Sequence, residues 1–497
     1  MKKSIKFLSL TLVLILTFST LLLTSCKKTG SSNENDGSNP YIIKTEVKDG
    51  CIWVTYSNDP ENPVNIGALG VDGSTGAEDS LNYYPLPDNT YGITAGNAKY
   101  LEAIVIPETY NGKPVTAILD NAFNGATNLQ KITIPSSIKL VGENAFENCG
   151  KLKFNELNGA LYLGNDTNPF LVLIEAKETN ITECVIDQNT IAICNDAFYN
   201  CANLSVLTIP KNVTSIGSRA FYGCSRITSL TLSEGPTFIG AETFKDCSSL
   251  QEISIPASVT TISTSAFAGC KSLASVTFAK DSSLTSIGNS AFSNCTKLKS
   301  ITIPKSVVNI GDHKANKNTD GAFSGCNNLT SVTIDKDSAL TQIGNYAFDA
   351  CTNLESFDFP NSLKRLGISA FRSCGALKNV TLPDTLTSIS QEAFWGCKKL
   401  ETLTLGKNTK SIGDKAFAGC VKLNNVTIPA TANYIGTNAF FECNELKNIT
   451  VEDAEKWYAV KGSEIIEIKT KGDFSSPSTA AVYLTDTYND YSFQKTK

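Results

Sequence analysis

Cysteine and histidine are the side chains in this sequence with the greatest capacity for chemistry. The chain of 497 residues contains 16 cysteines and one histidine, His313. Cysteines in this number are typical of a disulfide framework in a secreted chain or of thiolate zinc sites. With one histidine, any Ser/His/Asp or Cys/His relay and any multi-histidine metal site would have to be built around His313. The spacing of the cysteines decides how they are interpreted.

Twelve of the cysteines fall into one register, and most neighbours in it are 23 residues apart. A phenylalanine lies three residues before each of them, and an alanine precedes that phenylalanine in every copy but one, where Thr243 stands before Phe244. An earlier copy, Ala122-Phe123, has Ala126 in the cysteine position. The register comprises Cys149, Cys201, Cys224, Cys247, Cys270, Cys295, Cys326, Cys351, Cys374, Cys397, Cys420 and Cys443.

The elements that position these cysteines follow from the repeated unit, C-x-x-L-x-x-[ILV]-x-[ILVF]-P-x-x-[VL]-x-x-I-G-x-x-A-F-x-x, as in residues 201–223. The apolar alternation over residues 204–209 predicts a short strand with Thr208 outward. We interpret Gly217 as permitting a turn that other residues resist, and Phe221 as the core residue of a short helical turn. A unit of this length cannot close a core alone, so its copies must stack as a parallel solenoid.

These residues resemble the BspA-like leucine-rich repeats of bacterial surface proteins, whose signature is LxxIxIPxxVxxIGxxAFxxC. The resemblance covers about residues 86–451. It implies a curved leucine-rich-repeat solenoid with a parallel β-sheet on the concave face; the short helical or turn segments and the β-rich caps are expected from the residues themselves. It also implies a role like that of BspA-like proteins, which look like adhesins for host or neighbouring-cell proteins.

The solenoid is expected over residues 117–451, between a β-rich N-terminal cap region at 41–116 and a C-terminal cap and tail at 452–497. Segment 159–187 lacks the Ala-Phe-Cys signature and carries two apolar runs that suit an extra hairpin. The longest insertion, 312–321, has aspartate and asparagine oxygens that suit a hard cation, but it lacks the downstream glutamate of a calcium loop. We therefore predict no metal site.

The N-terminus has the pattern of an export signal. Residues 1–25 combine a basic start with an apolar run, and they are followed by Cys26. The Leu-Thr-Ser-Cys ending resembles the bacterial lipobox, which implies that Cys26 is acylated and anchors the mature chain in a membrane. Ordinary secretory cleavage beside a bystander cysteine is the alternative. Residues 26–40 are rich in Gly, Ser and Asn and are interpreted as a flexible tether.

The twelve cysteines of the register are interpreted as buried core residues, one rung apart. Disulfides between equivalent rungs would force alternate rungs to distort in opposite ways, and a free buried cysteine behaves as a small hydrophobe. Disulfides and metal binding are the alternatives. Cys184 falls on an inward leucine position and Cys194 on the glycine position, so both are interpreted as structural. Cys51 lies outside the array and has no assignment.

The outward strand position is nearly constant and is predicted to line a concave binding face. Ten of its twelve residues are threonine. The β-propensity of threonine on an exposed sheet explains this without any ligand, and a hydroxyl-lined surface for a protein or glycan is the functional alternative. The position comprises Thr133, Thr208, Thr231, Ser254, Thr277, Thr302, Thr333, Asp358, Thr381, Thr404, Thr427 and Thr450. Aromatic residues after the Ala-Phe pair are expected to pack at coil edges or to form contact patches: Tyr199, Tyr222, Trp395 and Phe441.

Composition and motifs exclude several functions. The net charge is −5 and no basic patch indicates nucleic acid. No phosphate-cradling glycine loop, nucleophile elbow or clustered carboxylate pair is present in the sequence, so we predict neither an enzyme nor a cofactor.

The prediction is a lipid-anchored protein of the bacterial cell envelope, on the cell surface or in the periplasm, that binds extracellular or cell-surface proteins, or glycans. A non-adhesive structural scaffold of the envelope is the alternative. An enzyme, with residues 41–116 as its only plausible location, is the third possibility.

Overall fold

The computed structural model describes residues 80–312, 321–335, 337–468 and 474–495. It also gives the backbone of three earlier strands, β1 (Ile42–Lys48), β2 (Cys51–Tyr56) and β3 (Asp59–Ala68), which pair antiparallel in the order β1-β2-β3. The predictions for the signal peptide, Cys26, the tether and His313 fall outside the described residues, as does most of the 312–321 insertion.

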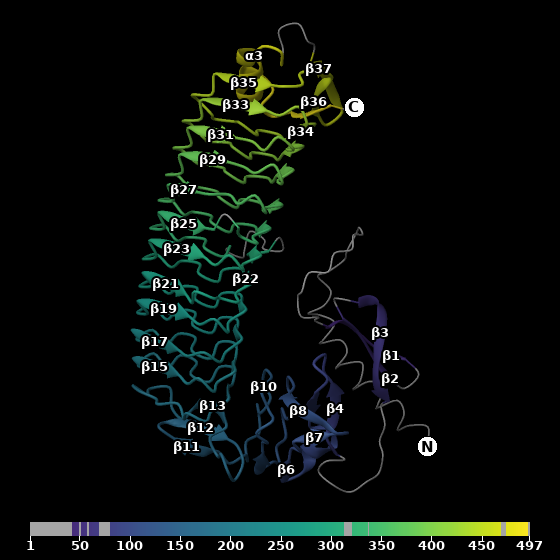
Figure 1. The fold of residues 1–497 in the computed structure, drawn as a ribbon, viewed down its shortest axis with the longest axis vertical. Helices are drawn as coiled ribbons and strands as arrows, with labels where there is room; N and C mark the ends of the chain where they lie inside the picture. The colour runs from purple at the N-terminus through teal and green to yellow at the C-terminus, as the bar shows by residue number, and fades with distance from the viewer. Residues whose placement is uncertain are drawn as a thin grey trace.

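The described chain winds as a parallel solenoid, and its turns stack along a curved array (Figure 1). Each regular turn contributes one strand to each of two columns. The first, which we call the threonine column, comprises β6 (Ala103–Val105), β9 (Lys131–Thr133), β15 (Val206–Ile209), β17 (Ser229–Leu232), β19 (Glu252–Ile255), β21 (Ser275–Phe278), β23 (Ser300–Ile303), β25 (Ser331–Ile334), β27 (Ser356–Phe357), β29 (Asn379–Thr381), β31 (Thr402–Thr404), β33 (Asn425–Ile428) and β35 (Asn448–Val451).

The second column consists mostly of two-residue strands, which we call the short-strand column. It comprises β8 (Lys113–Ile118), β10 (Leu140–Val141), β13 (Val172–Ala176), β14 (Ala192–Ile193), β16 (Ser215–Ile216), β18 (Phe238–Ile239), β20 (Thr261–Ile262), β22 (Ser286–Ile287), β24 (Asn309–Ile310), β26 (Gln342–Ile343), β28 (Arg365–Leu366), β30 (Ser388–Ile389), β32 (Ser411–Ile412) and β34 (Tyr434–Ile435). Figure 1 shows the two columns on opposite sides of the array.

Antiparallel elements lie at both ends. At the N-terminal end, β4 (Asn82–Pro85) pairs with β5 (Tyr91–Thr94), which runs parallel to β8; η1 (Gly96–Tyr100) and β7 (Thr109–Tyr110) complete this end. At the C-terminal end, β36 (Trp457–Lys461), β37 (Glu464–Ile468) and β38 (Ser492–Gln494) close antiparallel on β34, with α3 (Pro477–Val482) and the π-helical turn η2 (Tyr483–Thr487) between them in sequence.

Phenylalanine rings form the centre of the core. The ring centroids of neighbouring turns lie 5.1 to 5.5 Å apart along one continuous stack from Phe198 to Phe440. The fourteen cysteines of the described residues are all buried and free, which confirms their interpretation as core residues.

The turn around Phe221 corrects one local expectation and explains another. It is a hydrogen-bonded turn and not a helical one, because Arg219 and Gly223 adopt positive φ values of 56° and 71°. Gly217 does not have a positive φ, so a left-handed backbone is not the reason that other residues are resisted there. A Cβ at Gly217 would lie 2.4 Å from the main-chain nitrogen of Asn195 in the preceding turn. Glycine is needed there because successive turns approach closely.

One irregular turn divides the array. As predicted for segment 159–187, two strands form a hairpin: β12 (Ala160–Leu163) pairs antiparallel with β13, and β11 (Asn155–Leu157) pairs antiparallel with β12. The buried core separates here into two clusters, one that begins at Leu81 and one that continues to Phe493. We call the region around residues 150–187 the junction; the array bends next to β11–β13 (Figure 1).

Candidate binding surface

The outward residues of the threonine column form one polar surface, which we call the threonine face. Of the twelve predicted residues, eleven are exposed and Thr133 is half-buried. Strand alternation explains this, since the residues on either side of Thr208 are inward: Leu207 and Ile209 are buried. Parallel pairing in register sets each threonine beside the next, as Thr208 opposite Thr231. Asp358 lies one residue past β27 and is also exposed.

A second outward column runs two residues earlier along each strand. It is serine through the middle turns, at Ser275, Ser300, Ser331 and Ser356, and asparagine or threonine in the later ones, at Asn379, Thr402, Asn425 and Asn448. Side chains of neighbouring turns hydrogen-bond along it: Thr402 Oγ1 donates to Asn379 Oδ1 at 2.5 Å, and Asn448 Nδ2 donates to Asn425 Oδ1 at 3.2 Å. From β21 to β35 the threonine face is therefore a two-column surface made mostly of hydroxyls and amides, whereas earlier turns place Val206 and Glu252 in the second column.

Two ion pairs lie beside this surface, among charges of both signs. Lys378 Nζ lies 3.5 Å from Glu355, and Lys422 Nζ lies 2.5 Å from Glu445. These side chains are about half exposed, so each pair contributes on the order of 0 to 1 kcal/mol to stability. The threonine face thus offers hydrogen-bond donors and acceptors without a strong field of one sign.

The thiols lie in positions unsuited to nucleophilic chemistry. Burial raises the pKa of Cys201 to about 11 and that of Cys194 to about 12, so both remain protonated at neutral pH. Within the described residues, no group of three or more His, Cys, Asp or Glu side chains is placed to hold a metal ion. Among the same residues, no helix has the length and apolar character needed to cross a membrane.

The predicted edge aromatics lie on the turn side of the array and are partly exposed. Tyr199 and Tyr222 stack with ring centroids 5.0 Å apart. Trp395 and Phe441 are 42% and 40% exposed and do not stack on one another, since two turns separate them in the repeat. The structure therefore brings together only the tyrosine pair.

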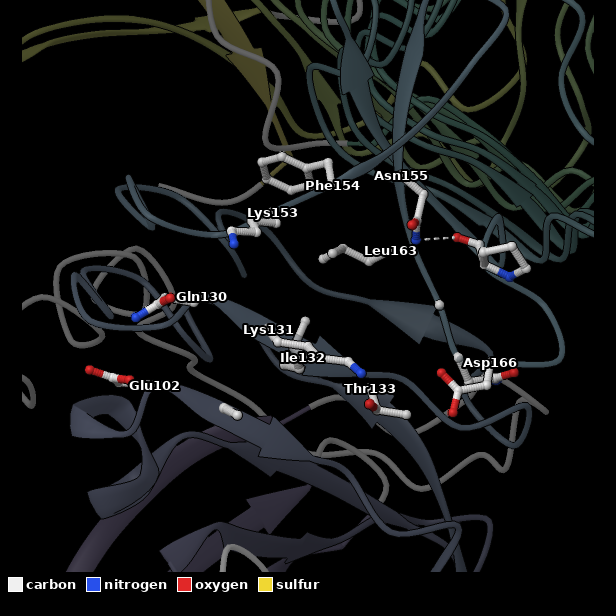
Figure 2. Close-up of a pocket in the computed structure, with 14 residues that line it drawn as sticks. Glu102, Gln130, Lys131, Ile132, Thr133, Lys153, Phe154, Asn155, Leu163 and Asp166 are labelled. Atoms are coloured by element: carbon white, nitrogen blue, oxygen red, sulfur yellow. Dashed lines mark hydrogen bonds between the residues drawn. The ribbon is translucent and has the colours of Figure 1, made fainter.

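A pocket of about 520 Å³ adjoins the threonine face at the junction (Figure 2). It opens where the chain leaves the threonine column. The last hydrogen bond between the two turns before the opening is from Lys153 N to Gln130 O at 3.0 Å, and the next after it is from Ile134 N to Gly164 O at 2.9 Å. Between these bonds, β11 pairs with β12 instead of with β9. The pocket is thus the space that the departing hairpin leaves beside β9.

The pocket lining combines an apolar floor with mixed charges. Figure 2 shows Ile132 and Leu163 inside it, Lys153 and Glu102 toward one end and Asp166 at the other. This pocket was not predicted from the sequence. The only signal for it was the interval of 52 residues between Cys149 and Cys201, which marks where the repeat is interrupted.

Comparison with known proteins identifies one family. The model described as the BspA type leucine rich repeat region matches in six copies, over residues 96–165, 176–283, 280–374, 316–447 and 366–476. No curated protein matches the chain.

Three solved structures are among those that the chain matches. A leucine-rich repeat protein from Bacteroides ovatus is 25% identical with a TM-score of 0.44, covering 77% of this chain and 88% of that one. A leucine rich cell surface protein from Faecalibacterium prausnitzii is 27% identical with a TM-score of 0.36, covering 77% and 89%. The pneumococcal vaccine antigen PcpA is 18% identical with a TM-score of 0.33, covering 82% and 81%.

Proposed function

The chain belongs to the BspA type leucine-rich repeat family, and on this premise we propose that it is an adhesin of the bacterial cell envelope. In this proposal the chain is exported, acylated at Cys26, and binds proteins of a host or of a neighbouring cell through its threonine face. The coarser conclusion rests on the family itself: such repeats are protein-interaction modules and are in general non-enzymatic scaffolds.

The observation that carries the proposal is the continuity of the threonine face. Eleven exposed hydroxyl or carboxylate positions follow one another, a turn apart, over the strands from β15 to β35. Stability alone would be met by β-propensity at each position and by the absence of like charges on neighbouring strands. A long surface of this kind supports many weak polar contacts, which add up when the partner is extended or multivalent.

Membrane anchoring supplies the other half of the proposal. Two or three acyl chains on Cys26 hold a protein stably at a bilayer, since each buried CH2 contributes about 0.8 kcal/mol. We expect Cys26→Ala to release the chain from the membrane fraction into the medium or the periplasm. Retention of the alanine variant in the detergent phase would count against acylation.

The binding claim is tested with an array of extracellular-matrix, host-surface and bacterial surface proteins. The variant Thr302→Glu, Thr333→Glu, Thr381→Glu places three negative charges along the threonine face. The matched control Thr387→Glu alters an exposed threonine that precedes β30 in the short-strand column. We expect the triple variant to lose at least tenfold in affinity for its array partner and the control to retain it. Wild-type chain that binds nothing in a broad array would favour an envelope scaffold instead.

A further inference from the structure

Regular turns of the array are joined by a ladder of main-chain hydrogen bonds beside the phenylalanine stack. Three N–H groups of each turn donate to carbonyls of the next: those of the phenylalanine and of the residues two before and two after it. In one turn, Asp196 N donates to Ser218 O at 3.1 Å, Phe198 N to Ala220 O at 2.6 Å and Asn200 N to Tyr222 O at 2.7 Å. The same pattern recurs along the array, so this ladder is a general means of holding one turn on the next.

The ladder is interrupted at the junction. The equivalent N–H groups belong to Asn144, Phe146 and Asn148, and within the described part of the chain none of the three donates to a carbonyl. The reason is that the following turn lacks the Ala-Phe signature and passes into the β11–β12 hairpin. On the far side of the gap, Ala176 N donates to Ala197 O at 2.6 Å, whereas the carbonyls of Asn195 and Tyr199 accept no main-chain hydrogen bond from the described residues.

The phenylalanine stack is interrupted at the same place. Phe146 stacks on Phe123 with centroids 5.6 Å apart, and no ring among the described residues covers its other face. Phe146 is 9% exposed, whereas Phe123 and Phe198 are 0% exposed. The turn that follows Phe146 therefore leaves three N–H groups of the Phe146 turn without a main-chain acceptor and provides no ring to continue the stack.

A cavity of about 480 Å³ occupies this position. Phe146, Leu152 and Ile174 give it an apolar interior, and Asn144 and Asn148 lie on the wall that carries the unpaired N–H groups. The unpaired groups on both sides of the cavity are main-chain N–H and C=O groups at regular intervals along the chain. The main chain of a polypeptide can pair with such a row of groups better than a compact small molecule can.

The charges around the cavity have one sign. Glu147, Glu175 and Asp196 line it, and no lysine or arginine is among the residues that do. Asp196 is engaged by Arg219 at 2.6 Å, and Glu147 accepts a hydrogen bond from Asn124 at 3.0 Å. Glu175 has no ion pair among the described residues. The rim therefore attracts a cationic group and repels an anion.

We propose that this cavity, which we call the vacant-turn site, binds a peptide loop of a partner protein that carries an aromatic side chain next to a basic one. The aromatic ring packs against the side of Phe146 that lines the cavity, and the loop carbonyls accept hydrogen bonds from the N–H groups of Asn144, Phe146 and Asn148. The basic side chain lies against Glu175. The loop thereby supplies the carbonyl acceptors and the ring that the turn after Phe146 does not provide, at a location separate from the threonine face.

The test uses a peptide with the sequence of one regular turn of this chain. The probe is a fluorescein-labelled cyclic hexapeptide that copies residues 368–373, Ile-Ser-Ala-Phe-Arg-Ser, titrated with the full chain and followed by fluorescence anisotropy. We expect saturable binding that weakens at least tenfold when alanine replaces either Phe371 or Arg372 in the peptide. Equal binding of these alanine peptides, or no binding at millimolar chain, overturns the proposal.

Two variants of the chain locate the site. A Cβ at Gly150 meets nothing within 4 Å and Gly150 has no positive φ, so Gly150→Trp folds and obstructs the cavity that Gly150 lines. Gly375 is the matched control position, because it follows Cys374 as Gly150 follows Cys149 but lies in a distant turn. A Cβ at Gly375 meets only Thr352 O at 3.8 Å. We expect Gly150→Trp and Glu175→Lys each to weaken binding at least tenfold and Gly375→Trp to leave it unchanged.

Unchanged binding by Gly150→Trp would show that the peptide binds elsewhere and would overturn the site. The triple glutamate variant of the threonine face separates the two proposals, because it should bind the hexapeptide as the wild type does. Both proposals predict that this variant loses array binding and keeps peptide binding. Retained array binding would contradict the role of the threonine face, and lost peptide binding would contradict the vacant-turn site.

Discussion

The repeated cysteine has a polar role as well as an apolar one. In each regular turn the thiol donates to the carbonyl of the phenylalanine one turn earlier, as Cys351 Sγ does to Phe323 O at 3.2 Å and Cys374 Sγ to Phe348 O at 3.2 Å. The spacing predicted burial of the sulfur, but it did not predict this donor, because the acceptor belongs to a different turn. The side chain is thus small enough for the core and still supplies a hydrogen bond across turns.

Replacing one thiol tests this role. We expect Cys351→Ala to lower the free energy of unfolding by about 1 to 2 kcal/mol, since it removes a weak hydrogen bond and leaves a small void. Urea denaturation followed by circular dichroism measures the change. An alanine variant as stable as the wild type would show that the S–H···O contact contributes nothing.

The buried thiols also predict a pH dependence. Burial raises the pKa of Cys201 to about 11 from an ordinary value of 9.0. Up to about pH 9 the thiol is protonated in both states; above it the unfolded chain ionises while the folded thiol stays protonated, so folding stability falls as the pH rises toward 11.

Each pH unit in that window costs about 1.4 kcal/mol per thiol that ionises only on unfolding. We therefore expect the urea midpoint to be level between pH 7 and 8 and to fall steeply from pH 9 to pH 11. The variant Cys201→Ala should show a shallower fall. A midpoint that is flat to pH 11 would contradict the burial of the thiols in solution.

At the scale of elements, the repeat made the strands and their register predictable. Residues 23 apart pair directly, as Leu207 with Leu230, because each regular turn has the same length and the same inward positions. The role of glycine was not predictable from the local pattern, since the contact that excludes a side chain at Gly367 comes from Gly344 in the preceding turn. Contacts between turns depend on how the turns stack, and one turn of sequence does not contain that information.

Two glycine variants test the close approach of the turns. A Cβ at Gly367 would lie 2.3 Å from the carbonyl carbon of Gly344, so we expect Gly367→Val to destabilise the fold by about 1 to 3 kcal/mol or to prevent folding. Gly375→Val, at a position with space, should stay within about 0.5 kcal/mol of the wild type. Thermal unfolding compares them, and equal melting temperatures would contradict the account.

At the scale of the whole molecule, the junction is the feature that the sequence indicated least completely. Its hairpin was predictable from the two apolar runs in segment 159–187. The unpaired N–H groups beside Phe146 and the pocket beside β9 were not predictable. Both arise because β11 pairs with β12 and not with β9. The alternation of apolar residues in β11 is compatible with pairing to either strand, so tertiary contacts decide between them.

The two core clusters predict two unfolding units. The free energy of a solenoid is a sum over neighbouring turns, so a weak interface between turns uncouples the parts on either side. We expect Phe123→Ala to lower only the transition of the N-terminal cluster and Phe348→Ala only that of the larger one, each by about 3 to 5 kcal/mol. Hydrogen exchange monitored by mass spectrometry resolves the two parts, and one cooperative transition shifted equally by both variants would contradict this.

The central claim is that the threonine face is the binding surface, and site-specific photo-cross-linking tests it most directly. Benzoylphenylalanine is placed at Thr333, on the threonine face, or at Thr387, beside the short-strand column, and the chain is irradiated with its strongest partner from the protein array. We predict a cross-link to the partner from position 333 and none from position 387. A cross-link from position 387 alone would contradict the account.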